Sequence, residues 1–184
     1  MTNAFLENFS YDNDAYNTYR REPILGLLIE VYIDGLCQPI NPGGIACYAF
    51  LVKSNGKTIY SEYGVVGKPF SIESTNNVAE YTALAKALEW LITNNLFSDK
   101  VEIKSDSQLL VNHLLGKYKV KARRIIPLYE TAILLKEKFP DVQIKWIPRE
   151  KNTEADMLTR VAYERALQEN AEATAGHIKT SERS

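Results

Sequence analysis

Apolar and polar residues change their spacing along the chain, and these changes predict the elements. Residues 24–34 are apolar on both faces of an extended segment, which predicts a strand in the middle of a sheet. Residues 45–53 and 57–66 predict two further strands, and the Asn55-Gly56 turn between them is a strong hairpin signal. We therefore expect three sequential antiparallel strands.

The second half of the chain alternates between helical and extended patterns. Ser74-Thr75-Asn76-Asn77 offers helix N-caps, and apolar residues then recur at helical spacing up to Asn94-Asn95. The elements expected after this helix are strand 101–106, helix 108–115, helix 127–139, strand 142–147 and helix 153–170. Antiparallel strands followed by alternating helices predict an α/β fold with a mixed sheet flanked by helices.

Length and composition predict one domain with loose ends. The chain has 184 residues, of which 45% are hydrophobic, so it is long enough for one domain with a substantial core. Residues 24–170 carry all the expected elements, whereas residues 1–23 are expected to form a flexible arm and residues 171–184 a frayed tail. No signal peptide pattern is present, and the apolar run at residues 24–33 is too short to span a bilayer. We expect a soluble cytoplasmic protein without a membrane partner.

Charge and cysteine content limit the kinds of partner and metal site that the chain can have. The formal net charge of -1 gives no overall basic field, so a polyanionic partner must be met by a local patch. Cys37 and Cys47 are the only cysteines, and they belong to no CxxC or Cys/His cluster that could hold zinc. We expect both to be buried as small apolar residues.

Carboxylates stand at the ends of four expected elements. Asp34 ends the first strand and Asp106 the fourth, whereas Glu80 lies near the start of the long helix and Asp156 near the start of the last helix. Taken singly, each has an ordinary explanation, such as helix capping, the positive end of a helix dipole, or a turn. Together they would repel one another unless a cation lay between them, and hard oxygen ligands suit Mg²⁺ or Mn²⁺. The pattern therefore predicts a divalent-metal site.

The segments around these acids resemble, in order, the motifs of type 1 ribonuclease H. The resemblance extends from about Leu27 to Ala166, and the matching segments are Tyr32-Ile33-Asp34-Gly35, Asn41-Pro42-Gly43-Gly44, Ser74 to Glu80, Ser105 to Gln108 and Asn152 to Leu158. Trp146-Ile147-Pro148-Arg149-Glu150-Lys151-Asn152 is similar to the archaeal subgroup. A lone Asp-Gly means little, but the full ordered set in matching elements is a specific signal.

This resemblance implies a fold, an activity and a cofactor. The family fold is a five-stranded mixed sheet, with three antiparallel strands and then two parallel additions, flanked by helices. Members hydrolyse the RNA strand of RNA/DNA hybrids and leave 5′-phosphate and 3′-hydroxyl ends. Carried over by position, the catalytic metal ligands are Asp34, Glu80, Asp106 and Asp156, for two Mg²⁺ or Mn²⁺ ions bound together with the substrate. We expect the chain to act as a monomer.

The resemblance also implies substrate contacts. Asn41, Asn76, Asn77 and Gln108 match amide positions that meet 2′-hydroxyls in the shallow groove of an A-form-like duplex. Thr75 matches a residue that grips a phosphate of the DNA strand. Residues 75–77 are also favoured helix-cap types, and the two roles can coexist.

A basic run follows the short helix. Residues 117–124 contain five basic residues and no acidic one: Lys117, Lys119, Lys121, Arg123 and Arg124. Such a run neutralises phosphates and makes binding sensitive to salt, although many charge runs are only solvated surface. Because the run occupies the place of a longer basic protrusion in bacterial relatives, we favour substrate contact.

The chain departs from the family pattern at two places. Where many relatives have a loop histidine that assists product release, this chain has Arg149, which we include among the catalytic candidates. Arg149 and its neighbour Glu150 are alternatively solvated loop residues, and neither His113 nor His177 is placed to replace the histidine. Glu73 puts a negative charge beside Thr75, which is expected to weaken the contact with the DNA strand.

Two other functions stay open. One is a ribonuclease H-like module that binds nucleic acid without cleaving it, because fold alone does not fix activity. The other is a different metal nuclease of the same superfamily. No acid is lost, which disfavours the first, and Thr75-Asn76-Asn77 before Glu80 favours recognition of 2′-hydroxyls over the second.

Overall fold

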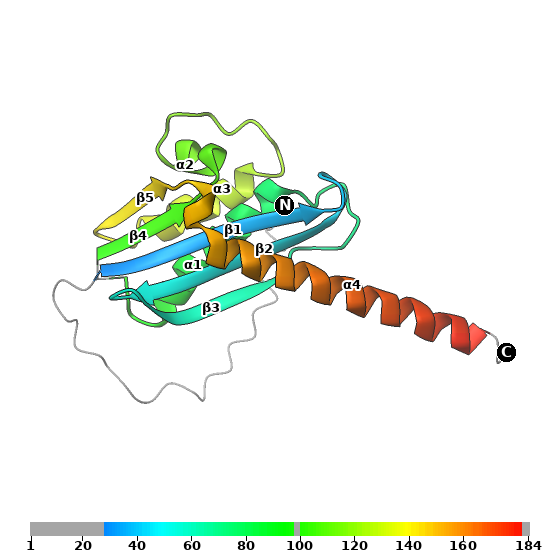
Figure 1. Ribbon diagram of the computed structural model, residues 1–184. Coiled ribbons are helices and arrows are strands. Elements are labelled where there is room, and N and C mark those ends of the chain that lie inside the picture. Colours follow the sequence, from blue (N-terminus) through cyan, green and yellow to red (C-terminus); the bar gives the residue numbers. More distant parts are fainter. Residues whose placement is uncertain (1–27, 98–99, 182–184) are drawn as a thin grey trace.

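Strand β1 (Leu28–Gln38) lies at the centre of a five-stranded sheet with the order β3-β2-β1-β4-β5 (Figure 1). The computed structural model describes residues 28–97 and 100–181. The other strands are β2 (Ile45–Ser54), β3 (Lys57–Val65), β4 (Lys100–Ser105) and β5 (Val142–Trp146). β1, β2 and β3 are antiparallel neighbours, whereas β4 and β5 continue the sheet in parallel with β1. The predicted mixed sheet and its three antiparallel strands are confirmed.

Four helices and one short 3-10 turn connect and cover the strands. The helices are α1 (Asn76–Thr93), α2 (Gln108–Leu114), α3 (Ile126–Lys136) and α4 (Thr153–Ser181), and the 3-10 turn is Arg149–Lys151. The predicted order of strands and helices is confirmed, except that the 3-10 turn was not expected. Thr75 caps α1, because its hydroxyl accepts a hydrogen bond of 3.1 Å from the Val78 nitrogen.

Alternating residues of β1 and β2 face two different helical layers. On one face, Val31 and Ile33 pack with Tyr81 and Leu88 of α1 in the main core. On the other face, Ile45 and Cys47 pack against Ala162 and Ala166, where α4 crosses β1, β2 and β3 (Figure 1). The two-residue period of a strand therefore places residues 30, 32 and 34 of β1 on the α4 side.

Three predicted ends of elements differ from the structure by three residues or more, and the others by about one residue. β1 does not end at Asp34, because its antiparallel pairing with β2 continues through Gln38, although the parallel pairing with β4 ends at Ile33 and Ser105. α4 does not end at Asn170 but continues to Ser181. α3 ends at Lys136 rather than at residue 139, although Phe139 is still buried in the core. The expected arm, residues 1–23, and the first residues of the predicted strand, 24–27, lie outside the described residues.

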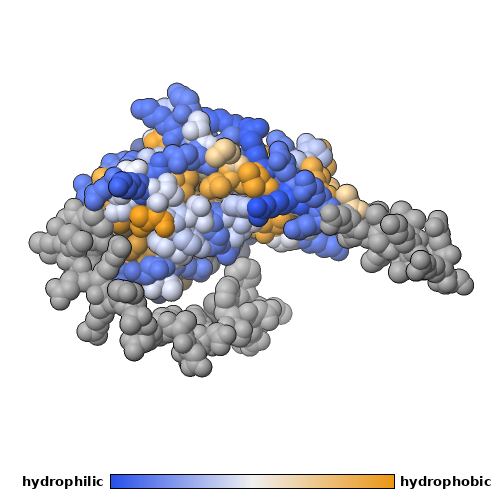
Figure 2. All heavy atoms as spheres, turned by 60° about the horizontal axis from the view of Figure 1, so that its bottom comes forward, coloured by the Kyte–Doolittle hydropathy of each residue, from blue (hydrophilic) through white to orange (hydrophobic). Residues whose placement is uncertain are grey.

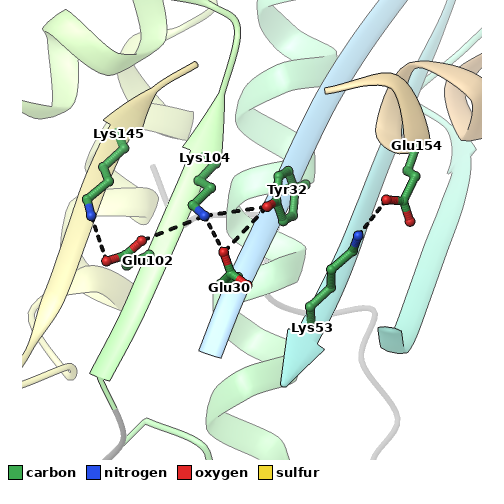
Figure 3. Close-up of polar contacts among 7 residues, drawn as sticks. All are labelled: Glu30, Tyr32, Lys53, Glu102, Lys104, Lys145 and Glu154. Atoms are coloured by element: carbon green, nitrogen blue, oxygen red, sulfur yellow. Dashed lines mark hydrogen bonds and ion pairs between the residues drawn. The ribbon is translucent and has the colours of Figure 1, made fainter. Parts of the chain in front are cut away.

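The part of the sheet that α4 does not cover carries paired charges (Figure 3). Lys104 binds the carboxylates of Glu30 and Glu102, and Lys145 binds Glu102 at 2.6 Å. The Tyr32 ring lies between two ammonium groups, 5.1 Å from Lys104 and 5.3 Å from Lys53. Lys53 in turn pairs with Glu154 at 2.5 Å, which ties β2 to the first turn of α4. Three lysines thus meet three glutamates on this face.

Apolar side chains are scattered over one side of the molecule. Seen with the lower side of the molecule forward, they form small groups separated by polar residues (Figure 2). None of the helices in the described ranges is long and apolar enough to cross a membrane. Cys37 and Cys47 are buried and unbonded to each other, as expected from the sequence.

Gly35 allows α1 to lie close against β1. A Cβ atom at this position would lie 2.4 Å from the backbone nitrogen of Glu80 and 2.8 Å from the carbonyl oxygen of Asn76. Backbone atoms cannot yield to such contacts unless the whole helix moves. Glycine at this position therefore fixes how near Glu80 comes to Asp34.

Replacing Gly35 with alanine is expected to lower the free energy of unfolding by about 1–3 kcal/mol, the range for an overpacked core. Urea unfolding measures the loss, and hydrogen exchange should show weaker protection of the amides in α1. The control is Gly56→Ala at the tip of the β2–β3 hairpin, where φ is +74° and a Cβ would meet nothing within 4 Å. It should cost about 1 kcal/mol through backbone strain alone. Unchanged protection of α1 in Gly35→Ala would contradict this explanation.

Candidate active site

The four predicted acids come together at one end of the central strands. Ile33 of β1 pairs with Ser105 of β4 in parallel register, so the residues that follow them, Asp34 and Asp106, emerge side by side. Glu80 enters from the second turn of α1, across the close contact at Gly35. Asp156 enters from the first turn of α4. Electrostatic coupling joins Asp34 to Asp106 and Asp156, and Glu80 to Asp34 and Asp106.

Two residues that sequence reasoning did not single out hold these acids in place. The buried Asn152 amide donates to the Ile33 carbonyl at 3.0 Å and to the Asp106 carboxylate at 2.8 Å. The hydroxyl of Thr159, which is fully buried, lies 2.9 Å from Asp34 Oδ2 and 2.8 Å from the Asp156 carbonyl oxygen. The available signals were an asparagine just before a helix start and a threonine one helical turn after Asp156.

Burial and mutual repulsion keep two of the acids from ionising easily. Burial raises the pKa of Asp34 to about 6, the Thr159 hydrogen bond opposes this shift, and the charges of Asp106 and Asp156 add to it. Burial raises the pKa of Glu80 to about 8, opposed by a hydrogen bond with Ser107 and increased by the charges of Asp34 and Asp106. Without a nearby cation, the site therefore favours the protonated form of these two acids.

Asp156 differs from the other acids because two arginines neutralise it. Arg160 donates to its Oδ2 and Arg149 to its Oδ1, each at 2.7 Å. These bonds, with that from Arg160 the larger, lower the pKa of Asp156 against the effect of burial. The predicted catalytic residue Arg149 thus lies at the site, on the 3-10 turn, and binds an acid rather than facing outward alone.

The donor set suits a hard divalent cation, although it is not gathered around a common point. Within residues 28–97 and 100–181, no three acidic, histidine or cysteine side chains are close enough together to hold an ion as they stand. The reason is visible in the hydrogen bonds, because Asn152 holds Asp106 and the two arginines hold Asp156. A cation would stabilise the ionised forms of Asp34 and Glu80, which burial and the neighbouring acids disfavour, so the residues fit such an ion chemically.

The predicted contacts for 2′-hydroxyls gather beside the acids. The Asn41 side chain accepts a hydrogen bond of 3.2 Å from the Asn76 nitrogen, and the Gly43 nitrogen donates to the Ser74 carbonyl at 3.0 Å. These bonds join the β1–β2 loop to the start of α1, where Thr75 and Asn77 also lie. The side-chain oxygen of Asn76 is buried and accepts no hydrogen bond from any described residue.

The basic run lies next to the loop before α1, and its side chains differ in exposure. Lys117, Lys119, Lys121 and Arg123 have exposed side chains, whereas Arg124 is half-buried. Arg124 donates to the Ile72 carbonyl at 2.5 Å and lies 3.8 Å from the Glu73 carboxylate. Glu73 is therefore partnered by Arg124, which ties the basic run to the loop before Thr75.

Gln108 begins α2, two residues after Asp106, and so also lies beside the acids. His113 of the same helix is buried, and its Nδ1 lies 3.1 Å from the Tyr81 hydroxyl. This position confirms that His113 does not take the place of a loop histidine.

Known proteins share this fold and much of this sequence. The family described as reverse transcriptase-like matches residues 44–162. Ribonuclease HI of Halobacterium salinarum is 31% identical over 145 residues, which are 79% of this chain and 69% of that protein. The N-terminal RNase H domain of a Mycobacterium tuberculosis protein has a TM-score of 0.69 at 27% identity, covering 79% of this chain and 99% of that domain.

A further solved structure, LC11-RNase H1 in complex with an RNA/DNA hybrid, has a TM-score of 0.67 at 34% identity, covering 76% of this chain and 99% of that one. Fold and acidic centre together thus define a ribonuclease H-like domain. The chain belongs to the type 1 ribonuclease H family, and the resemblance seen in its motifs is confirmed. It spans 34% of the length of the full-length bifunctional relative from Mycobacterium tuberculosis.

The raised pKa values predict a stability that falls as pH rises. The ordinary pKa values are 3.8 for Asp34 and 4.5 for Glu80, and the folded protein raises them to about 6 and about 8. Between the ordinary and the raised pKa of each group, the folded protein binds protons more tightly than the unfolded chain. When a chelator removes divalent metal ions, the free energy of unfolding should therefore decrease from pH 5 to pH 9. Glu80→Gln should flatten this decrease and be more stable than the wild type at pH 9, by on the order of 2–4 kcal/mol.

Urea unfolding across this pH range is the measurement. Glu150→Gln, on the exposed part of the 3-10 turn, should keep the wild-type pH dependence. A Glu80→Gln profile with the same slope as the wild type would contradict the assigned charge.

Proposed function

We propose that the protein is an endoribonuclease that hydrolyses the RNA strand of RNA/DNA hybrids with the help of two divalent metal ions. The observation that carries the proposal is the meeting of Asp34, Glu80, Asp106 and Asp156 where the pairing of β1 with β4 ends, with raised pKa values at the buried Asp34 and Glu80. The family membership supports the same activity, since a relative is named ribonuclease HI and another was solved with a hybrid.

We propose that residues of the β1–β2 loop and the start of α1 and α2 recognise the RNA strand. An RNA strand differs from DNA by its 2′-hydroxyls, which donate and accept hydrogen bonds in the shallow groove. The free, buried oxygen of Asn76 is an acceptor for such a donor, and Asn41, Asn77 and Gln108 lie around it and Asp106. Thr75, while capping α1, lies where we propose a phosphate of the DNA strand.

The residues that would hold the ions are the four acids. Two bound Mg²⁺ or Mn²⁺ ions would activate a water for attack on the phosphorus and stabilise the departing 3′-oxygen, which leaves 5′-phosphate and 3′-hydroxyl ends. Thr159 and Asn152 orient Asp34 and Asp106 for this role. Arg149 can release Asp156 and approach the phosphate, which is the catalytic part we propose for it. All of these groups come from one chain, so we propose action as a monomer.

A strand-labelled cleavage assay tests the proposed activity. RNA/DNA, RNA/RNA and DNA/DNA duplexes of one sequence are incubated with and without Mg²⁺, and we expect cleavage of the RNA strand of the hybrid only when Mg²⁺ is present. Asp34→Asn should abolish cleavage and retain hybrid binding, because it removes ligand charge but little volume. Hybrid binding without cleavage by the wild type would instead favour a non-cleaving module, and cleavage of DNA/DNA would favour another metal nuclease.

Neutralising Lys119 and Lys121 together should raise KM for the hybrid and flatten its dependence on salt by roughly one unit of log–log slope per lost phosphate contact. Both side chains are exposed and lie in the basic run. The matched control neutralises Lys57 and Lys138, which are equally exposed but lie on the β2–β3 hairpin and after α3. If both double variants have the same salt slope as the wild type, the basic run does not meet the substrate.

A further inference from the structure

A pocket of about 340 Å³ opens between α2 and β5, beside the acids. Its aromatic wall is Trp146, the last residue of β5, whose side chain is 46% exposed. The indole nitrogen donates a hydrogen bond of 3.1 Å to the Asp106 carbonyl oxygen, so the pocket begins where the acidic centre ends. Val111, Leu115 and Ile144 add apolar lining.

The polar groups of this pocket are free to bind something else. Gln108, Asn112 and Lys117 line it, and their side chains make no hydrogen bond or ion pair with any residue in the described ranges. Two amides, each able to donate and accept, and one ammonium group thus converge on an exposed indole. The backbone of Asn112 also holds the start of the basic run, because its carbonyl accepts from the nitrogens of Lys117 and Tyr118 at 2.9 and 3.1 Å.

This combination matches the chemistry of a single nucleotide. A base presents a flat face that stacks on an aromatic ring and an edge of donors and acceptors that pairs with amides. The volume is at the low end for ligand pockets, which suits one base rather than a duplex. A phosphate attached to the same nucleotide would be within the reach of an ammonium group such as that of Lys117.

Bases inside a duplex are stacked and paired, so only an unpaired base can enter. We propose that the pocket binds an unpaired ribonucleotide of the RNA strand where that strand leaves the hybrid, with the base stacked on Trp146 and its edge on Asn112. The proposal rests on the proposed function for its choice of strand, because Gln108 lies both at this pocket and beside Asp106. The enzyme would then favour hybrids that end in single-stranded RNA.

The first test reads binding without cleavage. Trp90 and Trp146 are the two tryptophans, so Trp90→Phe leaves Trp146 as the only indole while keeping a ring stacked on Tyr60. Titration of this protein with an RNA tetra-adenylate should quench its fluorescence to saturation. Adding Asn112→Ala should weaken binding about tenfold, within the range for one stacked and bonded base. The control Gln143→Ala removes an exposed amide that points to the opposite face of β5 and should change nothing.

The outcomes distinguish a failure of the proposed pocket from a failure of the proposed nuclease activity. Absence of saturable quenching, or equal binding by Asn112→Ala and the control, overturns the pocket, and equal binding of a DNA tetra-deoxyadenylate overturns the assignment to RNA. Quenching without any hybrid cleavage supports the pocket and overturns the nuclease. In the cleavage assay, an unpaired RNA extension should lower the wild-type KM severalfold relative to a blunt hybrid. Asn112→Ala should lose only this difference, and a retained difference overturns the proposal.

Discussion

The crowding of acidic side chains where the pairing of β1 with β4 ends is the constraint on which the rest of the structure depends. Parallel register brings Asp34 and Asp106 together, and Gly35 allows Glu80 to approach from α1. Burying carboxylates is costly unless they are protonated or paired with a cation, and the raised pKa values of Asp34 and Glu80 express that cost. The fold thus builds a place where a divalent ion is stabilising.

The residues around the acids either fix their positions or neutralise their charge. Asn152 and Thr159 fix Asp106 and Asp34 by hydrogen bonds, while Arg149 and Arg160 neutralise Asp156. Farther away, the open face of the sheet pairs Lys53, Lys104 and Lys145 with glutamates (Figure 3), whereas the basic run has four exposed cationic side chains. A polyanionic substrate is therefore directed to the edge formed by α1, the β1–β2 loop and the basic run.

Much of this arrangement could be predicted from the sequence, because its signals are local. Strand patterns, the Asn-Gly hairpin and the Thr75 cap each depend on a few adjacent residues, and the ordered motifs identified the acids. The end of β1 could not be predicted, since the strand continues past Asp34 only because β2 pairs with it. The bond from Asn152 to Asp106, that from Arg149 to Asp156 and the pairing of Arg124 with Glu73 join distant or turned segments, which no local pattern reports.

The central claim is that the acids share bound cations, and anomalous scattering from Mn²⁺ in crystals of the protein tests it most directly. We predict a strong anomalous peak within about 2–2.5 Å of carboxylate oxygens from Asp34 and at least one other of the four acids. Peaks confined to other parts of the surface, with none beside Asp34 at saturating Mn²⁺, would contradict the account.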